Sequence, residues 1–160
     1  MSDEQMSVSR TVDATPAEVF ALLSDPREHR NTEPGDWVRD SFDAEPITAV
    51  GQIFGMNMYS ARNESPYQMQ NEVFVFEPDR AIGWKPGRPA EAGDFAAGGW
   101  SWRYDLEPEG EGAKVTITYD WSGAPAELRE QFTFPPFDAD FLAAGLDSLA
   151  ERVVARRAEA

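Results

Sequence analysis

The chain has 160 residues, 41% of them hydrophobic, which is the length and apolar content of one domain with a sizeable core. Its 14 basic and 29 acidic side chains leave a net charge of −15, which repels nucleic acid phosphates and anionic lipid headgroups. Cysteine is absent, so disulfides, thiolate catalysis and Cys-ligated zinc are excluded. Residues 1–5 are acidic where a secretory signal is basic, and no apolar run approaches the ~20 residues of a membrane span. We therefore expect one domain, residues 1–160, in the cytoplasm, with neither nucleic acid nor membrane as a partner.

The first 30 residues predict a strand followed by two short helices. Residues 6–13 alternate in the manner of a half-buried strand. One face of this strand holds Met6, Val8, Arg10 and Val12. Thr15, Pro16 and Glu18 supply a capping Thr, a Pro at the first helical position and the Glu of a capping box, so a helix begins there. Asp25-Pro26 repeats this logic and opens a second helix that runs to about residue 30.

The middle of the chain predicts further strands with weaker signals. A short strand over 37–42 precedes a clearer one over 51–60, in which both faces carry apolar groups, so either face could be buried. Residues 67–77 are rich in β-forming side chains, and a tight turn leads from them into 81–85. The segment Pro86 to Gly98 holds two Pro, three Gly and four Ala, and we interpret it as a mobile surface loop and a lid over a binding site.

The strongest local pattern is a hairpin made of two alternating segments around a Gly-containing turn. The inward residues are Trp100, Trp102, Tyr104 and Leu106 on one strand, and Val115, Ile117, Tyr119 and Trp121 on the other. Residues 122–136 then form a connection with at most one or two helical turns.

A long helix is predicted from about Ala139 to Arg157, with Asp138 as its cap. Its buried stripe consists of Leu142, Leu146, Leu149 and Val153. Gly145 in mid-helix costs ~0.5–1 kcal/mol relative to Ala, so close packing or room for a ligand should justify it. The three arginines of the last turns, Arg152, Arg156 and Arg157, complement the helix dipole.

This order of elements resembles the START-like superfamily, which includes the Bet v 1 allergens and bacterial polyketide cyclases. The residues that carry the resemblance are Val8-Ser9-Arg10-Thr11-Val12, Thr15-Pro16-Ala17-Glu18-Val19-Phe20 with Asp25-Pro26, Phe76-Glu77-Pro78 and Trp102-Arg103-Tyr104. Together they are similar to the bacterial SRPBCC proteins of the polyketide cyclase/dehydrase type. The resemblance covers the whole chain and implies an α+β helix-grip fold. In that fold a curved antiparallel sheet of about six or seven strands surrounds a long C-terminal helix, with two short helices after the first strand.

The resemblance also implies a largely apolar cavity between the sheet and the C-terminal helix, which in the family holds lipids, sterols or aromatic polyketides. We therefore expect the protein to bind a small hydrophobic or aromatic ligand there. Two alternatives stay open, because a fold does not fix an activity. One is a polyketide cyclase/aromatase-like enzyme in which Tyr104 or Tyr119, near Arg10, acts as the acid or anion anchor. The other is a co-chaperone-like module that contacts a partner protein.

Aromatic and Met side chains on the predicted strands and helix supply the candidate ligand-binding set, because ligand pockets are mostly apolar. The candidate wall residues are Phe54, Met56, Met58, Trp102, Tyr104, Tyr119, Phe141 and Leu146. The candidate polar anchors are Arg10 and Asn57.

The remaining reactive side chains do not form a catalytic pattern. His29 is the only histidine, and the surrounding Arg27-Glu28-His29-Arg30 places it at an exposed helix end. One His without Cys does not make the usual zinc sites, and no glycine-rich phosphate motif lies between a strand and a helix. Glu107, Glu109 and Glu111 fall in the hairpin turn as solvated carboxylates. We therefore expect no metal and no cofactor, and assign no catalytic residue.

Overall fold

A computed structural model of the chain describes residues 4–33, 35, 37–41, 45–60, 64–89, 95–131, 133–135 and 137–159. The elements follow one another as β1 (Gln5–Val12), α1 (Pro16–Leu23), the 3-10 helix η1 (Pro26–Asn31), β2 (Val38–Ser41), β3 (Ile53–Ser60), β4 (Ser65–Glu77), β5 (Ala81–Pro89), β6 (Phe95–Ala97), β7 (Ser101–Glu109), β8 (Gly112–Asp120), α2 (Ala126–Gln131) and α3 (Ala139–Glu159). In the described ranges, no helix is long and apolar enough to span a membrane.

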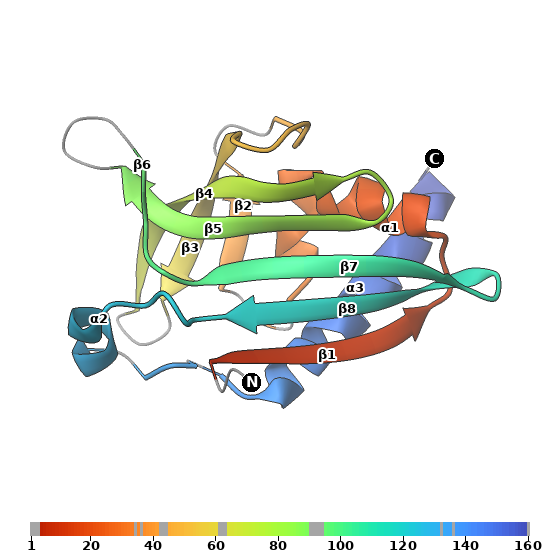
Figure 1. The fold of residues 1–160 in the computed structure, drawn as a ribbon. Coiled ribbons are helices and arrows are strands. Elements are labelled where there is room, and N and C mark those ends of the chain that lie inside the picture. The colour runs from red at the N-terminus through yellow and green to blue at the C-terminus, as the bar shows by residue number, and fades with distance from the viewer. Residues whose placement is uncertain are drawn as a thin grey trace.

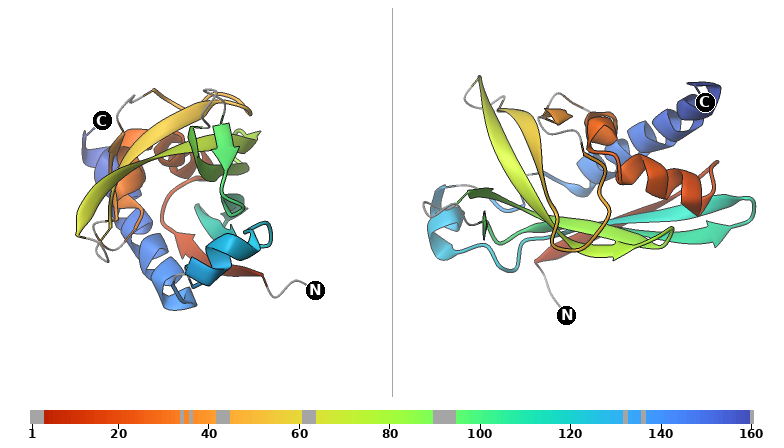
Figure 2. Two further views of the ribbon diagram at one scale, coloured as in Figure 1. Left: turned by 90° about the vertical axis from the view of Figure 1, so that its left-hand side faces the viewer. Right: turned by 90° about the horizontal axis from the view of Figure 1, so that it is seen from above.

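The strands form one antiparallel sheet in the order β1-β8-β7-β5-β4-β3-β2, and β6 pairs with β5. The sheet is open, with β1 at one edge and β2 at the other, and it curves so that α1 and α3 lie on the same side (Figures 1 and 2). This is the predicted α+β helix-grip fold, and the prediction is confirmed. The curvature matters because it separates the middle strands from α3 and leaves space between them.

The N-terminal capping signals form as predicted. The Thr15 hydroxyl accepts a hydrogen bond from the Glu18 N–H at 3.2 Å, and the Glu18 carboxylate accepts one from the Thr15 N–H at 3.1 Å. Asp25 likewise caps η1 by accepting from the Arg27 N–H at 3.1 Å. These two caps fix the bend between α1 and η1. Through this bend the chain passes from β1, at one edge of the sheet, to β2, at the other edge.

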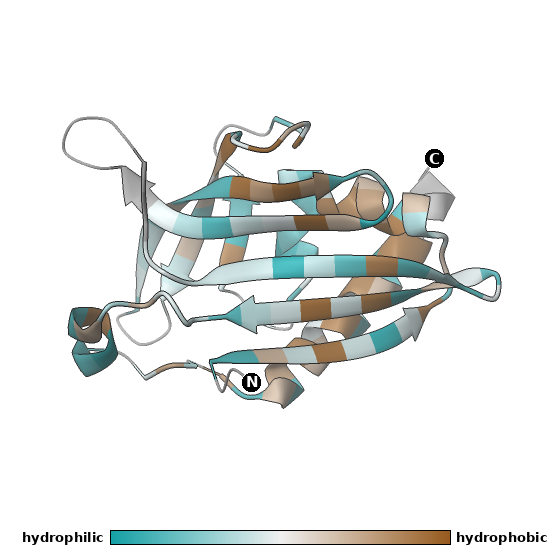
Figure 3. Cartoon of the chain, viewed as in Figure 1, coloured by the Kyte–Doolittle hydropathy of each residue, from teal (hydrophilic) through white to brown (hydrophobic). Residues whose placement is uncertain are grey.

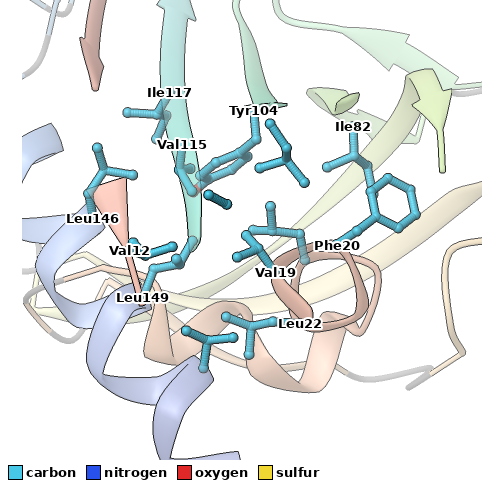
Figure 4. Close-up of a cluster of buried hydrophobic side chains, with 14 of the residues drawn as sticks. Val12, Val19, Phe20, Leu22, Ile82, Tyr104, Val115, Ile117, Leu146 and Leu149 are labelled. Carbon is cyan, nitrogen blue, oxygen red and sulfur yellow. The ribbon is translucent and has the colours of Figure 1, made fainter. Parts of the chain in front are cut away.

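The predicted hairpin is β7 and β8, in the predicted register. Trp102 lies opposite Tyr119 and Tyr104 lies opposite Ile117, so the large side chains of both strands share one face. In Figure 3 the strands alternate between hydrophilic and hydrophobic residues, while α1 and α3 present hydrophobic residues to the sheet. Figure 4 shows side chains from α1, α3, β5, β7 and β8 meeting in one buried cluster.

The interpretation of residues 86–98 as a surface loop is wrong at both ends of the segment. β5 continues to Pro89, and β6 pairs with it antiparallel, with Gly87 opposite Ala97. The backbone hydrogen bonds of an antiparallel ladder do not depend on side-chain type, so they form despite the poor β propensity of Gly and Ala. The centre of the predicted loop, 90–94, lies outside the described residues.

Helix α3 packs closely against the chain that follows η1. Asp138 caps the helix as predicted, accepting from the Phe141 N–H at 3.2 Å. A Cβ atom at Gly145 would lie 3.0 Å from the Thr32 carbonyl oxygen, and Gly145 also lines the cavity described below. Both reasons expected for this glycine therefore apply.

Two arginines of α3, Arg152 and Arg156, also contact η1, in addition to the dipole interaction predicted for them. Glu28 of η1 accepts from Arg152 through both carboxylate oxygens, at 2.7 Å and 2.9 Å, and Arg156 lies 3.9 Å away. The hydrogen bonds from Arg152 hold the pKa of Glu28 below its usual value. The Glu28 side chain is only 13% exposed, so this ion pair ties η1 to the C-terminal half of α3.

Substituting Glu28→Gln is expected to lower the free energy of unfolding by about 1–2 kcal/mol, because it removes the carboxylate charge that Arg152 and Arg156 pair with in a partly buried place. Urea unfolding followed by circular dichroism measures this loss. Asp147→Asn is the matched control. It removes a different ion pair of α3, the exposed one between Asp147 and Arg10 of β1. The control should change stability by less than about 0.5 kcal/mol, and equal losses in the two variants would contradict the assignment of Glu28.

Candidate functional site

A cavity of about 650 Å³ lies between the concave face of the sheet and α3. Its wall draws on η1, on strands β2 to β5, β7 and β8, on α2 and on α3. Aromatic and Met side chains form the largest group among the residues that line it. These are Trp37, Met56, Met58, Tyr67, Met69, Trp84, Trp100, Trp102, Tyr104, Tyr119, Phe134 and Phe141.

Six of the predicted site residues lie on this wall. They are Met56, Met58, Trp102, Tyr104, Tyr119 and Phe141. The alternation of β3 decides the face, because Phe54 and Met56 are buried while Ile53 is 39% exposed. The sequence did not decide which face of residues 51–60 points inward. The structure shows that it is the face with Phe54, Met56 and Met58.

The other four predicted residues lie outside the cavity wall. Phe54 and Leu146 are each 1% exposed and belong to the packed core. Arg10 projects toward α3, where its guanidinium contacts the Asp147 carboxylate at 2.7 Å. Asn57 lies on the opposite face of β3, where its carboxamide donates to Asp40 at 3.2 Å and accepts from Gln68 at 3.0 Å.

A group of aromatic rings packs around Phe137 and includes several residues of the cavity wall. Phe137 lies 4.7 Å from Phe141, 4.9 Å from Tyr119 and 5.5 Å from Trp102. Trp37 joins the group edge-on at 6.0 to 6.2 Å and donates from its indole N–H to the Tyr67 oxygen at 2.7 Å. Trp37 and Phe137 sit in connections, and no periodic pattern in the sequence predicts where such residues point.

His29 is buried, and its predicted exposure is wrong. The side chain is 5% exposed and lines the cavity, with Nε2 lying 2.7 Å from the Leu23 carbonyl oxygen. Its ring stacks on Trp84 at 4.6 Å and meets the edge of Phe54 at 5.3 Å. Burial lowers the pKa of His29 to about 4. The prediction was wrong because it took the charged neighbours of His29 as a sign of exposure. Arg27 and Arg30 are exposed, but His29 points to a different side of η1.

Asn71 is a second buried polar residue on the cavity wall that the sequence analysis missed. It is 6% exposed and lies on β4 directly opposite Phe54. The alternation of Met69, Asn71 and Val73 along one face of β4 is the signal that points Asn71 inward, because Val73 is fully buried.

Two of the tyrosines on the cavity wall, Tyr104 and Tyr119, are neutral phenols. Burial raises the pKa of Tyr104 to about 12, with hydrogen bonding to Thr32 acting in the opposite direction, and burial also raises the pKa of Tyr119 well above its usual value. Arg10 is not beside either phenol. It lies opposite Val115 on β8, whereas Tyr119 lies opposite Met6. The pairing of a phenol with Arg10 that the enzyme alternative needs is therefore not formed.

An open antiparallel sheet that curves around a C-terminal helix, with an apolar cavity between them, defines the helix-grip class of ligand-cavity folds. The model of the polyketide cyclase / dehydrase and lipid transport family matches residues 3–154, and the chain belongs to this family. The resemblance to the START-like and Bet v 1-like proteins is thereby confirmed.

The chain is similar to several known proteins at low sequence identity. The uncharacterized protein Rv0088 of Mycobacterium tuberculosis is 27% identical over 161 residues, a match that covers 94% of this chain and 66% of the relative, so the chain spans just under two thirds of that protein. The structure of protein NE0264 from Nitrosomonas europaea superposes with a TM-score of 0.74 at 14% identity, covering 99% of each chain. Major latex-like protein 151 of Panax ginseng superposes with a TM-score of 0.64 at 12% identity, covering 92% of this chain and 95% of that one.

Proposed function

We propose that the protein binds a small hydrophobic or aromatic molecule in the cavity between the sheet and α3. The observation that carries the proposal is the cavity itself, about 650 Å³ in volume, with aromatic and Met side chains as the largest group in its lining. This volume lies within the ~300–1,000 Å³ of typical small-molecule sites. Met side chains adapt to irregular ligands and aromatic rings stack on flat ones, so the wall favours a compact, ring-containing molecule.

The chemistry of the wall favours binding over turnover. The phenols of Tyr104 and Tyr119 hold their protons tightly, and the imidazole of His29 stays neutral. A general acid or base works best with a pKa near the working pH, and none of these three groups has one. They are suited to making hydrogen bonds with a held ligand.

Titration with N-phenyl-1-naphthylamine, a neutral aromatic probe, tests the proposal. Four of the five tryptophans line the cavity, namely Trp37, Trp84, Trp100 and Trp102. A bound probe should therefore quench tryptophan emission and fluoresce in its place, in a saturable 1:1 titration with a Kd on the order of micromolar.

Native mass spectrometry of the protein purified from its own host is the complementary measurement. A bound small molecule that the naphthylamine probe displaces supports the proposal and identifies the chemistry of the ligand. A clean apo mass together with the absence of saturable probe binding overturns it, and then a partner protein becomes the better candidate for the function.

A further inference from the structure

Two polar residues, His29 and Asn71, are buried among the described residues. Both lie on the cavity wall. They also lie close to the same core ring. Phe54 contacts His29 edge-on and is the cross-strand partner of Asn71. Directly opposed residues in an antiparallel pair project their side chains onto the same face. The part of the cavity wall beside Phe54 is therefore polar, and we call this part, formed by His29 and Asn71, the polar end of the cavity.

His29 offers a hydrogen-bond acceptor to the cavity. The Leu23 carbonyl oxygen can only accept, so Nε2, which lies 2.7 Å from it, carries the proton, and Nδ1 has a free lone pair. Trp84 and Phe54 hold the ring from two directions. Among the described residues, the only hydrogen bond of this ring is that of Nε2, and Nδ1 is not among the atoms that are both enclosed and unpaired, so it is open to the cavity that His29 lines.

Asn71 offers both a donor and an acceptor. Its carboxamide forms no hydrogen bond with another described residue, and neither of its polar atoms is both enclosed and unpaired, so the carboxamide is open to the cavity that Asn71 lines. Buried polar groups are normally paired, and one left unpaired costs about 1–3 kcal/mol. An apolar ligand that covers Asn71 and His29 Nδ1 creates this cost, whereas a ligand that pairs with both avoids it.

The cavity is poorly suited to an anionic ligand. The described side chains that line it include no Lys or Arg, and its charged member is the acidic Glu33. The Nδ1 lone pair of a neutral imidazole repels a carboxylate, and burial opposes the protonation that would reverse this. A carboxylate placed at the polar end would be a buried charge without a partner.

We propose that His29 and Asn71 select an uncharged ligand that carries a hydroxyl group, a phenol or an alcohol, at the polar end of the cavity. The ligand O–H donates to His29 Nδ1, and the ligand oxygen accepts from Asn71 Nδ2. This inference rests on the proposed function and adds the chemical class of the ligand. A site built to pair with a hydroxyl discriminates against an analogue that lacks one, because the site's own polar groups are then left unpaired.

Three naphthalenes of similar shape test the selectivity by isothermal titration calorimetry. We expect 2-naphthol to bind about tenfold tighter than 2-methylnaphthalene, and 2-naphthoate to bind more weakly than either. In Asn71→Leu, which keeps the branched shape and the number of side-chain heavy atoms, the preference for 2-naphthol over 2-methylnaphthalene should shrink by about threefold or more. Gln70→Leu, on the other face of the same strand, is the matched control and should keep the full preference.

The role of His29 can be read without a substitution, because it is the only histidine in the chain. In protein labelled with 15N-histidine, the Nδ1 resonance should move upfield when 2-naphthol binds and stay in place with 2-methylnaphthalene. Equal affinities for the alcohol and the hydrocarbon, with an unmoved Nδ1 resonance, overturn the selectivity and leave the proposed cavity function standing. Failure of all three naphthalenes to bind overturns both.

Discussion

On acidification from about pH 7 to about pH 4.5, the protein is expected to lose about 2–3 kcal/mol of its free energy of unfolding through His29 alone. The pKa of His29 falls from 6.5 to about 4 on folding, because the buried imidazole cannot be hydrated as a cation. The unfolded chain therefore takes up a proton below about pH 6.5 that the folded chain takes up only near pH 4. The stabilisation is fully present above pH 6.5 and is lost as the pH falls from there to about 4.

The control for this prediction is His29→Gln, which does not titrate and whose amide N–H can donate to Leu23 as Nε2 does. Asp25 and Glu28 are the carboxylates that interact with His29, and their pKa values are lowered. Their protonation in acid therefore also lowers the free energy of unfolding, but both residues remain in the variant, so this loss is common to the two proteins. The variant should therefore lose about 2–3 kcal/mol less than the wild type over the same range in urea unfolding. A direct NMR titration of the single histidine should give a midpoint near 4, and a midpoint near 6.5 would falsify the assignment.

Filling the cavity is expected to weaken binding of N-phenyl-1-naphthylamine about a hundredfold, or ~2.7 kcal/mol. The double variant Met58→Trp/Ser60→Trp adds two indole rings to the inward face of β3, where both wild-type side chains line the cavity. Each ring has to be displaced or compressed before a ligand enters, and overpacking of this kind costs ~1–3 kcal/mol per site. The probe titration described above measures the change.

The matched control is Ile53→Trp/Tyr59→Trp, which places the same two rings on the outward face of the same strand. Its affinity for the probe should stay within about twofold of the wild type. Thermal unfolding of both double variants checks that each remains folded. If inward and outward variants bind equally well, the probe does not occupy the cavity.

The proposed selectivity of the site depends on His29 and Asn71, which the sequence did not assign to the cavity wall. Six wall residues were predictable because alternation on β3, β7 and β8 assigns a face to every second side chain. His29 was not, since its position in a short 3-10 helix gives no period long enough to define a buried face. Arg10 shares the inward face of β1 as predicted, but its side chain reaches Asp147 on α3, a partner 137 residues away in the chain.

The sequence alone determined the parts of this protein that depend on local physics. A capping box at Thr15 and an N-cap at Asp25 start the helices, period-two alternation defines the strands, and spacing by three and four defines the buried stripe of α3. Only the tertiary structure decided how the sheet curves away from α3 and which side chains meet in the space between them. The cavity wall joins residues from η1 to α3, and such contacts follow from the packing of whole elements, which no local pattern encodes.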